Sequence, residues 1–498
     1  MEIVKDNDTL EIKMIGAEEA MESIWTKTYS LDKRQPLQEN IETEIAVIGA
    51  GMAGILIAYQ LQKIGKKVVV LEAKSIGSGQ TKNTTAKITS QHNLIYHQLI
   101  KSKGEEKARQ YAMANQQAIK EYKQIIQDEQ ILCDFEEINS YVFSENLTEL
   151  EEEVQAAIKL GLPASLIEEI SLPFPTKGAV KFERQAQFHP LKFLQVLSEQ
   201  LTIYENTFVQ RVEDHTLVTA RGTVTAKKII FACHYPFVNF PGMYFTRMHQ
   251  ERSYVLALKN ACQMDGIYIG EYENSTYSFR NYGDLLLFGG EGHRTGENSN
   301  GGRYESLREK AKQFYPNSYE VTCWSAQDCI SSDGVPFIGN YSVGKPDWYV
   351  ATGFQKWGMT TSMVSSLLLR DMICGIEHPY AEVFSPQRFS TEDMTGLINE
   401  GGQAMKGLSK RFFQVPNDAM KDLPLNHGGI IQYENEKIGV YKDKNNTIYA
   451  IQPKCPHLGC QLEWNPDELS WDCPCHGSRF DYEGNQINGP AQEGIAHE

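Results

Sequence analysis

The chain contains 498 residues and carries a formal net charge of −16, from 48 lysine and arginine residues against 64 acidic ones. This length exceeds one ordinary hydrophobic core and predicts about two to four domains. The negative charge argues against nucleic acid or an anionic membrane as a partner. The sequence has no apolar run of about 18 residues, so we expect no membrane span. Its polar N-terminus lacks the apolar core of a signal peptide, which favours a cytoplasmic protein.

A dinucleotide-binding pattern lies near the start of the chain. A short apolar strand is predicted at 44–48, a helix at 55–64 and a second strand at 67–71, which ends in Glu72. The glycines of the G-x-G-x-x-G pattern between the first strand and the helix are Gly49, Gly51 and Gly54. Such glycines let a pyrophosphate approach the backbone at the helix N-terminus, and the acid accepts hydrogen bonds from the ribose. The pattern predicts dinucleotide binding without choosing between FAD and NAD.

Two further loops have compositions that suit a flavin. The first, at 77–85, is rich in small hydroxyl side chains, and the second, at 352–360, opens from a strand into an apolar helix. A glycine-flanked loop at a helix N-terminus suits the electron-rich edge of a flavin ring. The candidate cofactor-binding residues in and before these loops are Ser78, Thr81, Asn83, Thr84, Asp333, Gly353, Trp357, Gly358, Met359 and Thr360.

Two loops near the C-terminus carry the ligand types of a metal centre. They read Cys-Pro-His-Leu-Gly-Cys at 455–460 and Cys-Pro-Cys-His-Gly-Ser at 473–478. One thiolate and one imidazole from each loop give the ligand set of a Rieske [2Fe–2S] centre. A Cys₂His₂ zinc site uses the same ligand types. We disfavour zinc because both loops carry an additional cysteine and are rich in proline and glycine, whereas a zinc finger places its histidines on a helix.

These loops resemble the cluster-binding loops of the Rieske proteins of cytochrome bc complexes. By this resemblance, the cluster ligands are Cys455, His457, Cys473 and His476. The resemblance also implies a disulfide between Cys460 and Cys475. It further implies a hydrogen bond from Ser478 to a cluster sulfur and a covering proline loop at 489–491. Phe480 departs from the pattern, since those proteins carry a tyrosine there. The six cysteines outside the loops are scattered singly, as in a reducing compartment, so the disulfide would be an exception.

The FAD-type segments resemble those of the glycine and D-amino-acid oxidase superfamily, whose members oxidise amines and amino acids. The resemblance spans about residues 40–380. Within it, the stretch 84–92 and the pair His234-Tyr235 are similar to a branch of bacterial FAD oxidoreductases fused to a C-terminal Rieske domain. This resemblance implies an α/β FAD-binding (Rossmann-like) domain, an α+β substrate domain and an all-β Rieske domain. It implies FAD and one [2Fe–2S] cluster as cofactors.

The domain bounds expected from this resemblance and from the composition follow the chain. They are an N-terminal extension at 1–40, the oxidoreductase at 41–385, a polar linker at 386–410 and the Rieske domain at 411–498. We expect a discontinuous FAD-binding domain at about 41–95, 180–238 and 325–385, and a substrate domain at about 96–179 and 239–324. Strand-like segments such as 254–258 and 285–288 predict a mixed sheet above the flavin.

The substrate site has weaker signals in the sequence. Candidate catalytic residues, whose segments match the sheet and the flavin loop of the family, are Tyr254, Arg280, His293 and Lys356, with Trp357 as a further candidate. Relatives that take small amino acids often hold the carboxylate with a lysine at the end of the flavin loop, where this chain has Thr360. An amine, or a carboxylate held by Arg280, is therefore open as substrate.

These features predict an FAD-dependent oxidoreductase that oxidises a small amine or amino acid. Electrons would pass from the flavin to the Rieske cluster and on to an unknown external acceptor. A flavin accepts two electrons together and can release them singly, so a one-electron centre beside it suits that release. One alternative is an amine oxidase that uses oxygen and keeps the cluster for structure or sensing. The other is a non-catalytic electron-transfer protein.

Overall fold

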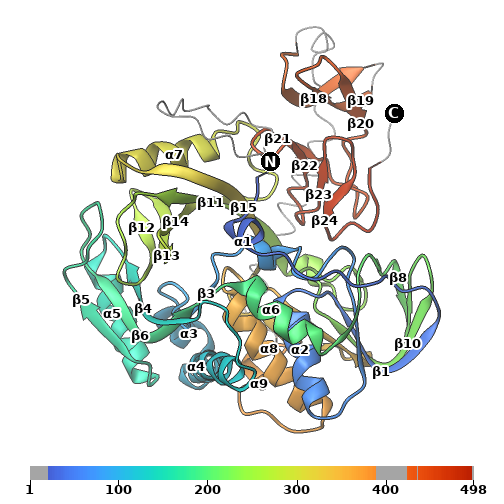
Figure 1. The fold of residues 1–498 in the computed structure, drawn as a ribbon, viewed down its shortest axis with the longest axis horizontal. Coiled ribbons are helices and arrows are strands. Elements are labelled where there is room, and N and C mark those ends of the chain that lie inside the picture. The colour runs from blue at the N-terminus through green and yellow to red at the C-terminus, as the bar shows by residue number, and fades with distance from the viewer. Residues whose placement is uncertain (1–20, 389–422, 434–435, 496–498) are drawn as a thin grey trace, which may run out of the picture.

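The computed structural model describes residues 21–388, 423–433 and 436–495 (Figure 1). Residues 1–20 of the predicted N-terminal extension and residues 389–410 of the predicted linker lie outside the described residues. The described strands form four sheets, two large ones in the first 388 residues and two small ones in the C-terminal part. Within these residues, no helix combines the length and the apolar character that a membrane span requires.

The first large sheet carries the dinucleotide-binding pattern. Its main strands, in spatial order, are β16 (Phe337–Ser342), β17 (Lys345–Thr352), β10 (Thr223–Phe231), β1 (Ile41–Ile48), β2 (Val68–Leu71) and β7 (Thr202–Tyr204). A hairpin of β8 (Arg211–Glu213) and β9 (Thr216–Val218) extends β10. The strands from β17 to β7 are parallel, and only β16 is antiparallel to its neighbour on this path. Their near-continuous apolar sequences are typical of parallel strands covered on both faces.

Helices cover this sheet and place two helix N-termini at its carboxyl edge. Helix α2 (Met52–Lys63) follows β1, and α8 (Gly358–Ile373) follows β17 and packs against α2. Helix α6 (Pro190–Glu199) packs on α2. The predicted helix at 55–64 begins three residues earlier, because the backbone turns helical within the glycine pattern itself.

The second large sheet is mixed, as the strand-like segments predicted. Its spatial order is β15 (Tyr319–Ser331), β11 (Met248–Lys259), β14 (Leu285–Arg294), β13 (Ser275–Tyr282), β12 (Ile267–Tyr272), β4 (Glu136–Phe143), β6 (Ala179–Gln187) and β3 (Lys87–Ile88), with β5 (Ala164–Ile167) paired to β6. The helices and the 3₁₀ turns of this part are α1 (Ile24–Thr28), η1 (Gln80–Asn83), α3 (Tyr96–Lys103), α4 (Glu105–Asp128), α5 (Leu147–Lys159), η2 (Tyr244–Thr246), α7 (Arg303–Phe314) and α9 (Ala381–Phe384).

The C-terminal part contains only short strands and turns among its described residues. One sheet holds β18 (His427–Tyr433), β19 (Glu436–Lys442) and β20 (Ile448–Ile451), and the other holds β21 (Glu463–Asn465), β22 (Ser470–Asp472), β23 (Arg479–Asp481) and β24 (Gln486–Asn488). The cluster-ligand loops flank this second sheet. Figure 1 shows β21–β24 beside β11 and β15, the edge of the mixed sheet. The edge of the mixed sheet therefore meets the ligand-bearing end of the C-terminal part.

Candidate active site and metal centre

A cavity of about 910 Å³ is lined by both large sheets and by the C-terminal part. Ten of the predicted cofactor-binding residues line it: Gly49, Gly51, Glu72, Ser78, Thr81, Asn83, Thr84, Trp357, Gly358 and Met359. They come from the β1–α2 turn, the end of β2, the η1 loop and the start of α8, segments that are far apart in the sequence. The fold thus gathers the predicted FAD residues on the walls of one cavity.

The β1–α2 turn has the backbone geometry that a pyrophosphate needs. Gly49 has φ +104°, and a Cβ there would lie 2.6 Å from the carbonyl oxygen of Ala232, so only glycine fits. Gly51 is the N-cap of α2, and Gly51, Met52 and Ala53 line the cavity at this helix N-terminus; the Met52 N–H donates to the Thr81 hydroxyl at 2.9 Å. The Glu72 carboxylate accepts from the Ala50 N–H at 2.8 Å and from the Lys74 N–H at 2.9 Å, which fixes it beside the turn. Burial raises the pKa of Glu72. This cradle fits the adenosine diphosphate part of FAD.

Four predicted cofactor residues do not line the cavity, so their assignment to FAD stays a prediction. Asp333 forms ion pairs with Lys103 at 2.9 Å and Arg388 at 2.7 Å, and these cations outweigh burial and lower its pKa. The hydroxyl of Thr360 donates to the carbonyl of Thr89 at 2.8 Å and so ties α8 to the segment around β3. Gly54 and Gly353 do not line the cavity either. A Cβ at Gly54 would lie 1.8 Å from the Gly49 carbonyl oxygen, so this glycine permits the tight turn.

Three of the four catalytic candidates line the cavity. The Tyr254 hydroxyl and the His293 Nε2 lie 3.0 Å apart, and the Lys356 Nζ lies 3.0 Å from Glu251. The role of Arg280 stays a prediction: its guanidinium donates to the carbonyls of Thr85 and Ala86 at 2.7 and 2.9 Å, and Arg280 does not line the cavity. A guanidinium whose donors serve backbone carbonyls supports the loop instead of a substrate carboxylate.

Four polar residues in the cavity wall were missed by the sequence reasoning: Lys87, His234, Glu251 and Asp328. Burial lowers the pKa of Lys87 to about 7, and its Nζ contacts the hydroxyls of Thr85 and Ser278. Burial raises the pKa of Asp328 to about 6. For Glu251 and Asp328, the available signal was the alternation of side chains along β11 and β15. This alternation shows which side chains face the cavity only once the register of the strands is known.

The cluster-ligand loops meet in the C-terminal part. The rings of His457 and His476 lie 5.0 Å apart at 90°, and the thiols of Cys455 and Cys473 are close enough to hydrogen-bond. Cys460 and Cys475 form a disulfide with an S–S distance of 2.20 Å, the pairing that the resemblance implied. Six residues of these loops are thus brought together (Cys455, His457, Cys460, Cys473, Cys475 and His476), all of them buried except the half-buried His457.

The ligand atoms suit a cluster held by two thiolates and two imidazoles. The His457 Nδ1 is buried and has no hydrogen-bond partner within the described residues, whereas its Nε2 lies 2.8 Å from the Asn239 Oδ1. A buried polar atom without a partner is costly, so such an atom points to a missing ligand. The buried thiols of Cys455 and Cys473 lie beside it. The residues present fit a Rieske cluster.

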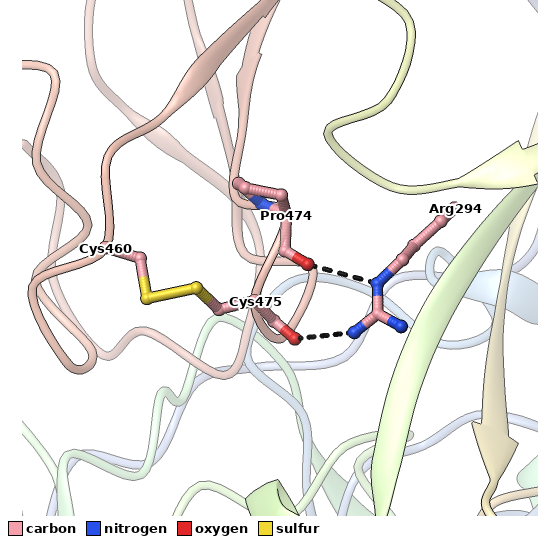
Figure 2. The surroundings of a disulfide bond; sticks show 4 residues. All are labelled: Arg294, Cys460, Pro474 and Cys475. Atoms are coloured by element: carbon pink, nitrogen blue, oxygen red, sulfur yellow. Dashed lines mark hydrogen bonds between the residues drawn. A yellow bond between two sulfur atoms is a disulfide. The ribbon is translucent and has the colours of Figure 1, made fainter. Parts of the chain in front are cut away.

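The cluster loops are held against the mixed sheet through their backbone carbonyls. Arg294 donates to the carbonyl oxygens of Pro474 and Cys475 at 3.2 and 3.3 Å, next to the disulfide (Figure 2). Gln250 donates to the His476 carbonyl at 2.7 Å, and Gln327 donates to the Gly477 carbonyl at 2.7 Å. Four carbonyls of the second ligand loop therefore accept from side chains of β11, β14 and β15.

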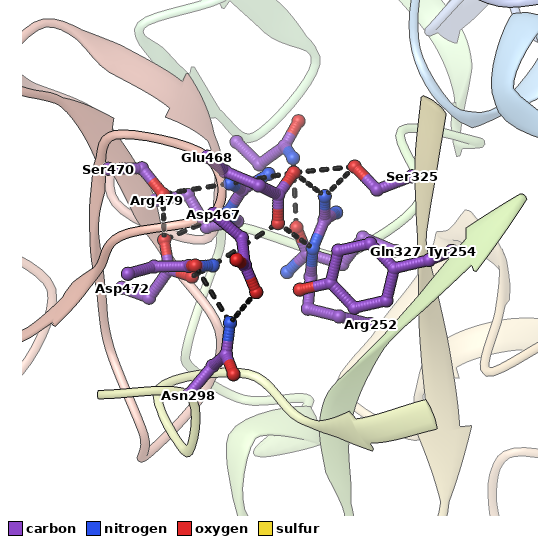
Figure 3. Close-up of polar contacts among 12 residues, drawn as sticks. Arg252, Tyr254, Asn298, Ser325, Gln327, Asp467, Glu468, Ser470, Asp472 and Arg479 are labelled. Atoms are coloured by element: carbon purple, nitrogen blue, oxygen red, sulfur yellow. Dashed lines mark hydrogen bonds and ion pairs between the residues drawn. The ribbon is translucent and has the colours of Figure 1, made fainter. Parts of the chain in front are cut away.

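A buried ionic network strengthens this contact. Glu468 pairs with Arg252 from β11 and, at 3.2 Å, with Arg479 from β23, and it also accepts from Ser325 (Figure 3). Its side chain is only 6% exposed. Burial raises the pKa of Glu468, but the two arginines outweigh this effect and hold it well below the ordinary value.

Strands β11 and β15 separate the cavity from the cluster loops. Because side chains alternate between the faces of a strand, one set faces the cavity and the other faces the C-terminal part. The cavity-facing set is Glu251, Ser253, Ala326 and Asp328. The opposite set is Gln250, Arg252, Ser325 and Gln327. Tyr254 lies beside Arg252 on this second side, although it also borders the cavity (Figure 3). At the edge of these strands, residues 486–490 and Gln492 of the C-terminal part line the cavity directly.

Comparisons with known proteins agree with this arrangement. The family model "FAD dependent oxidoreductase" (DAO) matches residues 44–372, and the "Rieske [2Fe-2S] domain" model matches residues 414–497. A protein of Bacillus subtilis (strain 168) named as a candidate Rieske 2Fe-2S iron-sulfur protein, YhfW, is 36% identical over 493 residues, covering 95% of this chain and 97% of that protein.

Solved structures share the fold of the oxidoreductase part. Glycine oxidase from Geobacillus kaustophilus superposes with a TM-score of 0.57 at 16% identity, over 70% of this chain and 99% of that one. L-proline dehydrogenase from P. horikoshii superposes with a TM-score of 0.59 at 17% identity, over 71% and 98%. At such identities the likeness concerns the fold alone.

Proposed function

Since this chain belongs to the family of FAD-dependent oxidoreductases and carries a Rieske [2Fe–2S] domain, we propose that it oxidises a small amine or amino acid and passes the electrons from flavin to the cluster. An external acceptor would then take electrons from the cluster. The cytoplasm is the proposed compartment, since the six cysteines outside the ligand loops are placed singly.

The substrate reaction breaks a C–H and an N–H bond. An ammonium form of the substrate first loses one proton to water. A hydride then leaves the carbon of the neutral amine, a proton leaves the nitrogen, and the resulting imine is hydrolysed by water to a carbonyl compound and ammonia or a smaller amine. Bound FAD supplies the hydride acceptor. The chain's part is to position the reacting carbon and to exclude solvent, for which Tyr254, His293 and Lys356 lie in the cavity wall. The solved relatives named as glycine oxidase and L-proline dehydrogenase support this substrate class.

One observation carries the electron relay: β11 and β15 border the cavity with one face and the cluster loops with the other. A cluster that served only as a remote structural element would not need its ligand loop at the wall of the catalytic cavity. The proline loop supports the same proposal, because Gly489 and Pro490 line the cavity themselves.

A chain of hydrogen bonds crosses this wall. His234 lines the cavity, and its Nε2 lies 3.1 Å from the Gln250 Oε1. The Gln250 amide nitrogen donates to the carbonyls of His476 at 2.7 Å and Gly489 at 3.1 Å. His234 has φ +68°, a backbone conformation that costs about 1–3 kcal/mol in non-glycine residues, and Thr352 donates to its carbonyl at 2.6 Å. The strained position supports a role for His234 in the route from flavin to cluster.

The relay is tested by reducing the flavin without oxygen. Holoenzyme is photoreduced or mixed with amine anaerobically, and flavin absorbance and the EPR signal of the reduced cluster are followed together. We expect the cluster to be reduced within milliseconds to seconds after the flavin. The Cys455→Ser variant, which should lose the cluster and keep FAD, should hold its flavin reduced. The opposite result is a cluster that stays oxidised for many minutes beside a fully reduced flavin, with equal turnover with oxygen in the wild type and in Cys455→Ser. That result would establish an oxidase whose cluster serves for structure or sensing.

A further inference from the structure

The wall of the cavity formed by β11 and β15 contains a carboxylate without a partner. Asp328 on β15 is the cross-strand neighbour of Glu251 on β11, and both side chains line the cavity. Glu251 is paired with Lys356 at 3.0 Å, with His249 at 3.4 Å on its other side. Over residues 21–388, 423–433 and 436–495, Asp328 has neither an ion pair nor a side-chain hydrogen bond.

The charges of this wall do not balance within the protein. His249 and Lys356 lower the pKa of Glu251 to about 2, which shows that the available lysine is already committed to Glu251. Arg252 follows Glu251 in the sequence, but its side chain faces the C-terminal part, where it pairs with Glu468. Two carboxylates therefore face one lysine. Burial raises the pKa of Asp328 to about 6, and the charge of Lys356 offsets this rise only in part. A partly buried carboxylate without an ion pair is stabilised when a cation binds beside it.

The other lysines and arginines that line the cavity are Lys74, Lys87 and Arg303, and their contacts lie away from Asp328. Lys74 donates to the carbonyl of Ile487 at 3.2 Å, and Arg303 pairs with Glu291 at 3.4 Å. Lys87, on β3 at the far edge of the mixed sheet from β15, contacts the hydroxyls of Thr85 and Ser278. The cavity wall at Asp328 thus carries no spare positive charge for a substrate carboxylate.

We propose that Asp328 binds the ammonium group of the substrate, and that the substrates are amines without a carboxylate on the reacting carbon. This inference rests on the proposed oxidation at the same cavity and narrows its substrate class. In an α-amino acid the carboxylate is two bonds from the nitrogen, so an ammonium at Asp328 would bring that carboxylate against Asp328 and Glu251. Like charges at such separations repel, whereas the cationic group of a simple amine is attracted by both.

Matched substrate pairs test the inference on the wild-type holoenzyme. Each amino acid is compared with the amine that remains when its carboxylate is replaced by hydrogen: glycine with methylamine, alanine with ethylamine, proline with pyrrolidine, and phenylalanine with phenethylamine. Anaerobic flavin reduction is measured at equal concentrations. We expect at least one amine to reduce the flavin at least tenfold faster than its amino acid. Faster reduction by the amino acids in every active pair overturns the inference and leaves the proposed function intact. No reduction by either member of any pair counts against both.

The Asp328→Asn variant separates ammonium binding from a structural role. It removes the charge and keeps the shape, so the KM for the preferred amine should rise about tenfold or more, as expected for a lost charge-assisted hydrogen bond. The FAD content and cluster EPR signal should stay as in the wild type. Glu320→Gln is the matched control, because Glu320 lies on the same strand but pairs with Arg308 outside the cavity. An unchanged amine KM in Asp328→Asn, or a gain of amine affinity, contradicts the proposal even if the amines are substrates.

Discussion

Glu72 links the cofactor turn to the second strand of the sheet through two backbone N–H groups. Replacing it with alanine removes this support and the ribose acceptor, so FAD affinity should fall by about 1.5–3 kcal/mol, the range for hydrogen bonds to a charged group. Gly51→Val should abolish FAD binding, because the side chain fills the cradle at the start of α2. Fluorescence titration of the apoprotein with FAD measures both, with the exposed Glu42→Ala as control. NAD instead of FAD in the wild-type extract would contradict the cofactor assignment.

Ser478 is placed to tune the cluster. Its oxygen accepts from the Ala491 N–H at 3.0 Å, which leaves the hydroxyl proton for a sulfur, and it lies within hydrogen-bond reach of Cys455. Hydrogen bonds to sulfur stabilise the more negative, reduced cluster. Ser478→Ala should therefore lower the reduction potential by about 20–60 mV, from about 0.5–1.5 kcal/mol per bond. Phe480→Tyr should raise it. Voltammetry on the full chain measures both shifts, and unchanged potentials would show that this feature of bc-type proteins is not shared.

Asp328 should also make the affinity for amine depend on pH. Its pKa is raised by burial to about 6, so the carboxylate that binds a cation is present above pH 6 and is lost as the pH falls below it. Glu251, Lys356 and His249 face the same wall, and Glu251 stays ionised through this range because its pKa is about 2. Amine affinity should fall roughly tenfold per pH unit below 6. The Asp328→Asn variant should lose this dependence in a titration of KM against pH, and a dependence that persists would have to come from another group.

At the scale of elements, the contact between β11 and the C-terminal sheet depends on Glu468. Changing it to glutamine leaves Arg252 buried without its counter-charge, whereas Arg479 keeps Asp472 at 2.9 Å. Removing one partner of a buried ion pair costs about 3–5 kcal/mol. In urea, the visible signal of the cluster should therefore be lost at lower concentration, with little change in flavin release. The exposed Glu483→Gln is the control, and coincident unfolding of both signals at the wild-type midpoint would contradict this role.

Local elements were predictable from the sequence, and long-range placement was not. The β1–α2 turn and the loop before α8 were identified because glycines, apolar strands and helix starts follow each other within a few residues. Asp333 was assigned to FAD from its neighbours alone, yet its partners Lys103 and Arg388 come from distant segments. Asp328 was missed for the same reason, since its cavity position depends on the register between β15 and β11.

At the scale of the whole molecule, β11 and β15 form a wall that the cluster loops and the cavity share. The ligand motif and the FAD pattern identify two cofactors, but no local pattern says that residues near 250, 327 and 476 meet. Gln250 on β11 and Gln327 on β15 are, taken singly, ordinary polar residues in strands. Their common role, donation to carbonyls of one ligand loop, exists only after the oxidoreductase and the C-terminal part have docked.

This arrangement predicts that the two glutamines differ in function although both hold the loop. Neither glutamine lines the cavity, but Gln250 contacts the cavity residue His234 of the FAD-binding sheet, whereas Gln327 contacts Gly477 and Asn488, both of the C-terminal part. Gln250→Leu should slow cluster reduction by about fivefold or more, the factor for a lost hydrogen bond of about 1 kcal/mol, with flavin reduction by amine unchanged.

Gln327→Leu is the matched comparison, because it loosens the same loop and leaves the His234 contact in place. Both steps are resolved by rapid mixing, with the cluster content of each variant measured by EPR. A selective loss in Gln250→Leu assigns the electron route to the His234–Gln250 contact. Equal slowing in the two variants would instead show that the glutamines act only by docking, because loop position is the one property that both substitutions disturb.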